Sequence, residues 1–233
     1  MTAQGFFVTG TDTNVGKTRF SAALLQALAG LGMRVIGMKP VAAGAEQVDG
    51  VWLNEDVVQL QAAANVFADA SWVNPYLLRM PIAPHIAADF QGVSLELPRI
   101  RDAYEQLTAL ADVVVVEGAG GFKVPLSAHK DSADLAQMLG LPIILVVGMR
   151  LGCINHALLT AEAIRARGLT LAAWVANQID ADMPAYEANL TALRSRLACP
   201  LLAEFPFSPH AEARHSAALI APKKLLTLLD VAR

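Results

Sequence analysis

The stretch that decides the fold is Phe6-Phe7-Val8-Thr9-Gly10-Thr11-Asp12-Thr13-Asn14-Val15-Gly16-Lys17-Thr18. A short apolar run leads through a glycine-bounded loop into an amphipathic segment. Glycine lets the backbone approach phosphate groups, and N–H groups at a helix N-terminus attract anions. The common phosphate-binding loop has about four residues between its glycines, whereas this loop has five, Thr11 to Val15. The loop nevertheless ends in Gly16-Lys17-Thr18 and lies between a predicted strand and a predicted helix. These two features predict a phosphate loop in which Lys17 reaches the phosphates and Thr18 binds Mg²⁺.

The rest of the chain alternates short apolar runs with amphipathic stretches. An unalternating β-branched run such as 113–116 is typical of a strand buried on both faces of a parallel sheet. The alternation predicts an α/β fold: a doubly wound, mostly parallel sheet with helices on both faces, in three layers. We expect strands at 6–9, 35–38, 113–116, 142–147, 171–176 and, at an edge, 201–205, and helices at 17–29, 55–65, 94–110 (capped by Ser94), 132–139, 155–167, 184–197 and 222–231.

Composition excludes several classes of protein. The chain is 55% hydrophobic and 17% charged, which is too apolar for a disordered protein. The longest apolar run, 141–149, is far shorter than the roughly 20 residues of a membrane span. The 18 basic and 21 acidic residues give a net charge of −3, without a basic block that would favour nucleic acid. We therefore expect a cytoplasmic protein with neither membrane nor nucleic-acid partners.

Domain organisation and cysteine chemistry are simple. No shift in composition marks a linker, so residues 1–233 are expected to form one domain, with 74–89 as its one long irregular stretch. Cys153 and Cys199 are far apart and lack metal-binding spacing. Cys153 has no evident paired base, so a small buried or loop thiol is favoured over a nucleophile.

Three charged residues extend the phosphate site, two of them directly after predicted strands and one at the start of a predicted helix. Glu117 follows the buried run 113–116, where phosphate-loop proteins hold their metal. Asp56 is either a second metal carboxylate, since Mg²⁺ prefers oxygen, or an acid that favours the helix dipole. Lys39 ends the strand 35–38, where it either brings a second positive charge to the γ-phosphate or is an ordinary exposed lysine.

Four further segments or residues are candidates for ligand contacts, and three of them also have a structural interpretation. The glycines of Gly118-Ala119-Gly120-Gly121 indicate close approach to a ligand or a tight turn. Segment 148–155 opens a helix whose free N–H groups suit a carboxylate, or it is a plain loop with Asn155 as the cap. Asn177 can pair with an adenine edge. His85 either contacts a substrate or is structural, and a lone histidine is more often structural.

Segments in order along most of the chain resemble the dethiobiotin synthase family. They are specific together, although none is specific alone. These segments are 7–13 with 15–18, Lys39-Pro40-Val41, Asn74-Pro75-Tyr76, Pro84-His85, 116–121, Pro125-Leu126, 151–156 and 174–177.

The resemblance implies an ATP-dependent, carbon–nitrogen-forming cyclo-ligase of biotin biosynthesis with a phosphate-loop fold. Its substrates would be 7,8-diaminopelargonic acid and CO₂, with ATP and Mg²⁺ as cofactors. The product would be dethiobiotin, formed through a carbamate and a carbamic-phosphoric anhydride with release of ADP and phosphate. The resemblance also implies a homodimer in which the site for the substrate carboxylate lies across the interface.

The resemblance also implies a role for individual residues. Lys39 and Lys17 would be catalytic, and Thr18, Asp56 and Glu117 would hold the metal. The nucleotide would contact Asn14, Val15, Gly16, Lys17, Thr18, Arg19, Asp56, Glu117, Gly118, Ala119, Gly120, Asn177, Gln178, Pro206, Phe207 and Ser208. The substrate would contact Thr13, Lys39, Ala43, Gly120, Gly152, Cys153, Ile154 and Asn155.

Two positions depart from the family pattern. Asn14 stands where glutamate is frequent, and Ala43 stands where a serine often contacts the substrate. The loss of one neutral hydrogen bond costs about 1 kcal/mol. These departures therefore bear on affinity and not on the class of reaction.

Two other functions remain as alternatives. A nucleotide-switch ATPase of the partitioning or site-selection type shares such a sheet and an altered phosphate loop. Those proteins commonly carry a second lysine early in the loop, where this chain has Thr11. A GTP-sensing module is disfavoured because Asn177-Gln178-Ile179-Asp180 lacks the lysine of the guanine-reading Asn-Lys-x-Asp pattern.

Overall fold

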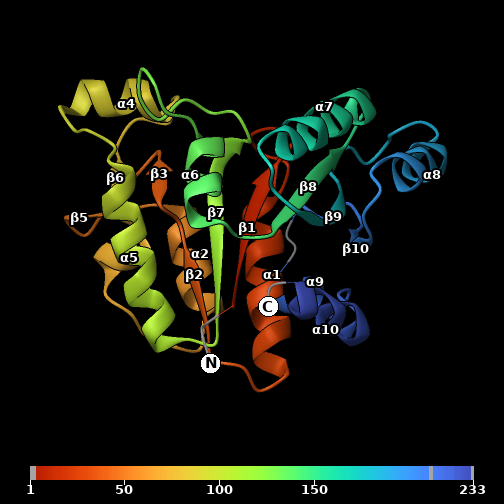
Figure 1. Cartoon of the computed structure of the whole chain (residues 1–233), viewed down its shortest axis with the longest axis horizontal. Coiled ribbons are helices and arrows are strands. Elements are labelled where there is room, and N and C mark those ends of the chain that lie inside the picture. The colour runs from red at the N-terminus through yellow and green to blue at the C-terminus, as the bar shows by residue number, and fades with distance from the viewer. Residues whose placement is uncertain (1–3, 210–211, 232–233) are drawn as a thin grey trace.

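Six parallel strands form the central sheet of the computed structural model, which describes residues 4–209 and 212–231. The strands lie in the order β10-β9-β8-β1-β7-β2 (Figure 1). They are β1 (Gln4–Gly10), β2 (Val35–Met38), β7 (Val113–Gly121), β8 (Ile143–Met149), β9 (Leu171–Gln178) and β10 (Leu201–Phe205). Each pair of neighbours is parallel. The predicted fold class is confirmed, as is the edge position of 201–205.

Helices cover both faces of this sheet. Because side chains alternate along a strand, Phe6 and Val8 enter one core cluster and Phe7 enters the other. The first face is covered by α1 (Lys17–Gly30), α2 (Glu55–Ala63), α9 (Ala213–Ala217) and α10 (Pro222–Val231). The second face is covered by α3 (Ala70–Val73), α4 (Pro84–Gln91), α5 (Leu97–Leu110), α6 (Ser132–Leu139), α7 (Cys153–Ala166) and α8 (Tyr186–Arg196). Within the described ranges, no helix is both long and apolar enough to cross a membrane.

Three helix starts were predicted wrongly. Helix α8 begins at Tyr186 with Ala185 at its N-cap, two residues after the predicted start at 184. Helix α5 begins at Leu97 with Glu96 at its N-cap, so Ser94 is not the cap. A proline lies in the first turn of α5, where its fixed φ and missing N–H are tolerated. Helix α7 begins at Cys153 with Gly152 at its N-cap, so Asn155 lies within the helix and does not cap it.

The stretch 74–89 is not irregular, contrary to prediction. It contains β6 (Tyr76–Leu78) and the start of α4, with Pro84 in the first turn of that helix. Strand β6 pairs in parallel with β3 (Val41–Ala43) in a small second sheet. These strands of three residues are too short to show a period along the sequence.

A β-hairpin also went unpredicted. Strands β4 (Glu46–Val48) and β5 (Val51–Leu53) are antiparallel, and Asp49 and Gly50 connect them with φ of 49° and 83°. Asp-Gly is a strong sequence signal for such a turn, because both positions need positive φ. The signal was present, but the flanking strands are short.

Candidate active site

The phosphate loop connects β1 to α1. Gly16 is the N-cap of α1 with φ 89°, and Asn14 also has a positive φ of 58°. A Cβ on Gly16 would lie 2.2 Å from Asn177 Nδ2, so this position requires glycine. In the described part of the chain, α1 has no side-chain N-cap bond and no acid in its first turn. The first N–H groups of α1 are therefore available to an anion.

Four predicted residues meet beside this loop. Lys39 Nζ donates to Asp56 Oδ2 at 2.7 Å and to Glu117 Oε1 at 2.6 Å. Thr18 Oγ1 lies 2.7 Å from Asp56 Oδ1 and 2.9 Å from Glu117 Oε1. Lys39 is 3% exposed and Glu117 is fully buried, so Lys39 is not the ordinary exposed lysine of the alternative interpretation.

The sheet brings Lys39 and Glu117 together. Strands β2 and β7 are neighbours with Met38 paired to Val116, so the next residue of each strand lies at the same height. Glu117 does not end its strand, because β7 continues to Gly121. The Asn74 side chain donates to the carbonyl oxygen of Lys39 at 2.6 Å and holds the backbone there.

Asp56 owes its position to Asn54, a residue that the sequence analysis did not single out. Asp56 lies in the first turn of α2, and Asn54 Oδ1 caps that helix by accepting from Val57 N at 3.3 Å. Asn54 Nδ2 donates to the carbonyl oxygens of Ala43 and Gly44 at 3.3 and 3.1 Å. An asparagine directly before a helix is a recognised capping signal that could have identified it. The Asp56 carboxylate therefore interacts favourably with the dipole of α2 and also accepts a hydrogen bond from Lys39.

The charges in this cluster shift one another's pKa. Burial and the charge of Lys39 lower the pKa of Lys17 to about 8. Burial opposes the charge on Lys39, but Glu117 and Asp56 outweigh it and raise the pKa of Lys39. Burial also disfavours the Asp56 carboxylate, but Lys39 outweighs it and lowers the pKa of Asp56. The two lysines therefore act on each other in one shared site, although Lys17 Nζ itself donates to Asp12 O at 3.0 Å.

The donor set fits Mg²⁺. Thr18, Asp56 and Glu117 supply oxygen atoms, which hard cations prefer. Glu117 Oε2 is buried without a hydrogen-bond partner among the described residues, and such an atom costs about 1–3 kcal/mol unless it is ligated. No cluster of three or more His, Cys, Asp or Glu suited to a metal occurs in ranges 4–209 and 212–231. Two carboxylates nevertheless suit Mg²⁺, which keeps waters and binds together with phosphates.

A second group of predicted residues gathers on the other side of the phosphate loop. Asn177 is 3% exposed, and its Nδ2 donates to Val15 O at 2.8 Å. Arg19 Nη1 donates to Asn177 Oδ1 at 3.0 Å and to Pro206 O at 3.1 Å. Gln178 Oε1 accepts from Phe207 N at 3.4 Å, and Ser208 follows on the exposed turn. The ends of β9 and β10 therefore lie beside the phosphate loop.

The predicted substrate residues come from separate segments. A Cβ on Gly120 would lie 3.5 Å from Thr13 Oγ1, so these two positions are close. Ala43 lies in β3, and Gly152-Cys153-Ile154-Asn155 begins α7. An ion pair of 2.7 Å between Arg150 and Asp12 links the α7 segment to the phosphate loop.

The surroundings of Cys153 and of His85 bear differently on the interpretations that the sequence offered for them. Cys153 is 2% exposed and burial raises the pKa of its thiol, which disfavours a nucleophile. His85 is half-buried on α4 and lines a cavity of about 460 Å³ together with residues such as Leu126 and Lys130. Its Nδ1 is buried without a hydrogen-bond partner among the described residues.

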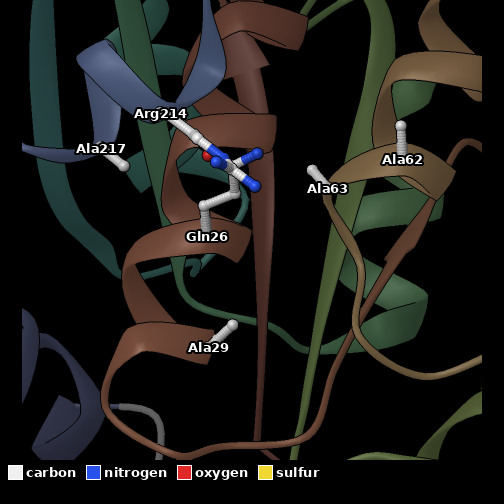
Figure 2. Close-up of a pocket in the computed structure, with 6 residues that line it drawn as sticks. All are labelled: Gln26, Ala29, Ala62, Ala63, Arg214 and Ala217. Carbon is white, nitrogen blue, oxygen red and sulfur yellow. The ribbon is translucent and has the colours of Figure 1, made fainter.

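A second cavity, of about 400 Å³, lies between α1, α2 and α9 (Figure 2). Gln26 and Ala29 of α1 line it, and they follow Lys17 by roughly two to three helical turns. In the view of Figure 2 the Gln26 and Arg214 side chains overlap, and the labelled alanines lie around them. This cavity is therefore separate from the phosphate loop.

The loop, the buried carboxylate on a neighbouring strand and the free start of α1 define a P-loop nucleotide-binding protein. A family model described as an AAA domain matches residues 4–215. The chain is 54% identical, over 99% of its length and 96% of the relative, to "ATP-dependent dethiobiotin synthetase BioD" of Nitrosospira multiformis. It is 56% identical to the protein of the same name from Aromatoleum aromaticum, over 92% of this chain and 96% of that one. The chain therefore belongs to the dethiobiotin synthetase family.

Solved structures with low sequence identity share the fold. The MinD cell division protein of Aquifex aeolicus has a TM-score of 0.60 at 15% identity, covering 98% of both chains. A ParA family ATPase of Chlorobium tepidum has a TM-score of 0.56 at 15% identity, covering 99% of this chain and 98% of that one. At this identity the likeness concerns the fold alone.

Proposed function

We propose that this chain catalyses ATP-dependent closure of 7,8-diaminopelargonic acid and CO₂ to dethiobiotin. This is a carbon–nitrogen ligase reaction of biotin biosynthesis, and residues 1–233 would carry it out as one domain. Membership of the synthetase family supports the reaction class. The observation that carries the proposal is the buried Lys39, paired with two carboxylates beside the phosphate loop.

The phosphates of ATP would lie over the start of α1, where N–H groups and Lys17 offset their charge. Thr18, Asp56 and Glu117 would hold Mg²⁺, whose contribution is to neutralise charge on the phosphates and to orient them. Gly118, Ala119 and Gly120 would let the β7 backbone approach the nucleotide. Asn177, Gln178 and the 206–208 turn would contact the base.

The chemistry divides into three balanced steps. One amine of the substrate adds to CO₂ and loses a proton, which gives a carbamate. A carbamate oxygen attacks the γ-phosphorus as the bond to ADP breaks, which gives a carbamic-phosphoric anhydride. The second amine attacks the carbonyl carbon, loses a proton and expels phosphate as the ring closes. Lys39 would stabilise the two anions that meet in the second step, which is mostly positioning and charge stabilisation.

The substrate carboxylate would bind at the start of α7, across the interface of a homodimer. Gly152 caps α7 with φ 95°, and in the described part of the chain no side chain caps this helix, so its N–H groups suit an anion. Leu151, just before α7, is 89% exposed and Leu159 on α7 is 58% exposed, as a surface that meets a second copy would be. Thr13 and Ala43 would contact the substrate from the chain that binds the nucleotide.

The nucleotide-switch alternative is not favoured. The MinD and ParA likenesses concern the fold alone at 15% identity, whereas the synthetase relatives are 54% and 56% identical. A switch ATPase would hydrolyse ATP without regard to the diamine. Diamine dependence therefore separates the two functions.

The test is turnover with MgATP, bicarbonate and 7,8-diaminopelargonic acid, with phosphate and dethiobiotin both measured. We expect both products in equal amounts, and phosphate release that ignores the diamine would refute the proposal. Lys39→Ala should lower turnover by about 10²-fold or more while nucleotide still binds. Lys223→Ala, at an exposed position on α10, is the matched control and should keep wild-type turnover.

A further inference from the structure

Arg19 on α1 holds together the elements around Asn177. Its Nη1 donates to Asn177 Oδ1 at 3.0 Å and to Pro206 O at 3.1 Å, and its Nε donates to Ser216 Oγ at 3.0 Å. Its guanidinium also lies over the Phe205 ring, 4.9 Å from the centroid. One side chain thus joins α1, the ends of β9 and β10, and α9, which packs beside α1 (Figure 1).

These contacts use the particular geometry of arginine. A guanidinium is planar and offers five donors in a fixed fork, and its face stacks on aromatic rings. Lysine carries the same charge but cannot reproduce the fork and the stacking together. Burial lowers the pKa of Arg19. Arg19 is therefore committed to these neighbours and is not a freely solvated surface charge.

Arg19 and Val15 together fix the orientation of the Asn177 amide. Asn177 Nδ2 donates to Val15 O at 2.8 Å while Asn177 Oδ1 accepts from Arg19. A flipped amide would bring oxygen against the Val15 carbonyl and N–H groups against the guanidinium. An asparagine amide has two N–H donors and two acceptor lone pairs. In this orientation one N–H and one lone pair of Asn177 remain for a ligand.

The remaining N–H donor and lone pair of Asn177 can distinguish adenine from guanine. The edge of adenine presents the N7 acceptor beside the N6 donor, whereas the edge of guanine presents two acceptors, N7 and O6. An amide held with one N–H and one lone pair complements adenine. Guanine O6 would instead face the fixed Asn177 oxygen.

We infer that Arg19 is a positioning residue that sets the preference for adenine over guanine nucleotides, acting through Asn177 and the 206–208 turn. The inference rests on the proposed function in one respect, since that proposal places the nucleotide base at Asn177. The inference goes beyond the proposed function because it assigns a role in base selectivity to the Arg19 side chain. The role concerns selectivity and nucleotide affinity, and not the transfer of the phosphoryl group.

The experiment compares ADP and GDP affinity by displacement of a fluorescent ADP analogue, without diamine or turnover. Arg19→Ala should weaken ADP binding by about tenfold or more and lower the ADP-to-GDP preference by a similar factor. Arg19→Lys should resemble Arg19→Ala, because charge alone does not fix the amide. Arg214→Ala removes an exposed arginine that lines the cavity of Figure 2 and should keep the wild-type preference.

Turnover assays separate positioning from chemistry. Arg19→Ala should raise the KM for ATP by about tenfold and leave kcat within about threefold, because the phosphates remain on the loop. An unchanged ADP-to-GDP preference, or a fall in kcat at constant KM, would overturn the inference. Wild-type protein that binds ADP selectively but ignores the diamine would refute the ligase proposal and leave this inference standing.

A milder variant decides the matter if Arg19→Ala does not fold. Ser216 is buried, and Ser216→Ala removes one hydrogen bond that holds Arg19 without touching Asn177 itself. We expect the ADP-to-GDP preference to fall by a few-fold, in the same direction as for Arg19→Ala. A preference equal to wild type in this folded variant would overturn the inference.

Discussion

Replacement of Lys39 by methionine is expected to destabilise the free protein strongly. Methionine has a similar length but carries no charge, so Asp56 and Glu117 would lose the cation that lies 2.7 and 2.6 Å from their oxygens. Removing one partner of a buried ion pair costs about 3–5 kcal/mol. Asp56 is 39% exposed and screened by water, whereas Glu117 is fully buried. We therefore expect a loss of about 3 kcal/mol.

The loss can be measured by urea unfolding of wild type and Lys39→Met at pH 7.5 in EDTA. For a domain of this size it corresponds to a fall of roughly 6–12 °C in Tm. Added Mg²⁺ should stabilise Lys39→Met more than wild type, since the vacated carboxylates can then bind the ion. The double variant Lys39→Met/Glu117→Gln removes the unpaired charge and should recover most of the stability.

A difference under about 1 kcal/mol between wild type and Lys39→Met in EDTA would refute this reasoning. Equal stabilisation of both proteins by Mg²⁺ would also count against it. Either result would mean that the Lys39 ammonium is not what neutralises the carboxylates in the free protein.

Three further outcomes are expected. Burial and Lys39 lower the pKa of Lys17 to about 8, so Lys17 is charged below that pH and loses its proton above it. ADP affinity should then fall by up to about tenfold per pH unit above pH 8, with proton uptake on binding in calorimetry; a flat pH profile would exclude Lys17 as the cause. Lys39 outweighs burial and lowers the pKa of Asp56, so its contribution to stability is present above about pH 4 and lost below it. Asp56→Asn should therefore unfold less steeply in acid, and an unchanged acid transition would contradict this. Thr18→Val should weaken the Mg²⁺ dependence of nucleotide binding, and an identical Mg²⁺ titration would remove Thr18 from the metal site.

The central sheet could be predicted because its strands are apolar runs that are recognisable in the local sequence. The run 113–116 is buried on both faces and reads as a strand without knowledge of its neighbours. The continuation of β7 through Gly121 could not be predicted, because glycine-rich segments have weak strand propensity. The cap at Ser94 was predicted wrongly, since local capping chemistry competed with a proline-started turn at Leu97.

Some features of the candidate site could also be predicted from local sequence, and others could not. The position of Lys17 and Thr18 at the start of α1 could be predicted from the local order of strand, loop and helix. The burial of Lys39 does not, because it depends on contact with Glu117, which is 78 residues away in the sequence. Asn54 and Asn74 donate side-chain hydrogen bonds to the backbone of distant segments, and spacing along the chain does not predict these partners. Only the place of Asn54 directly before α2 is a signal in the sequence.

The double attachment of Asn54 separates the tip of the β4–β5 hairpin from the position of Asp56. Asn54 Nδ2 bonds the backbone at Ala43 and Gly44 while its Oδ1 caps α2, so the two ends of the hairpin are closed at its base. The tip at Asp49 and Gly50 is exposed. Length changes are best tolerated at exposed tips of this kind. A short tag or a fluorophore inserted at this tip would report on ligand binding near Asp56 without changing the position of Asp56.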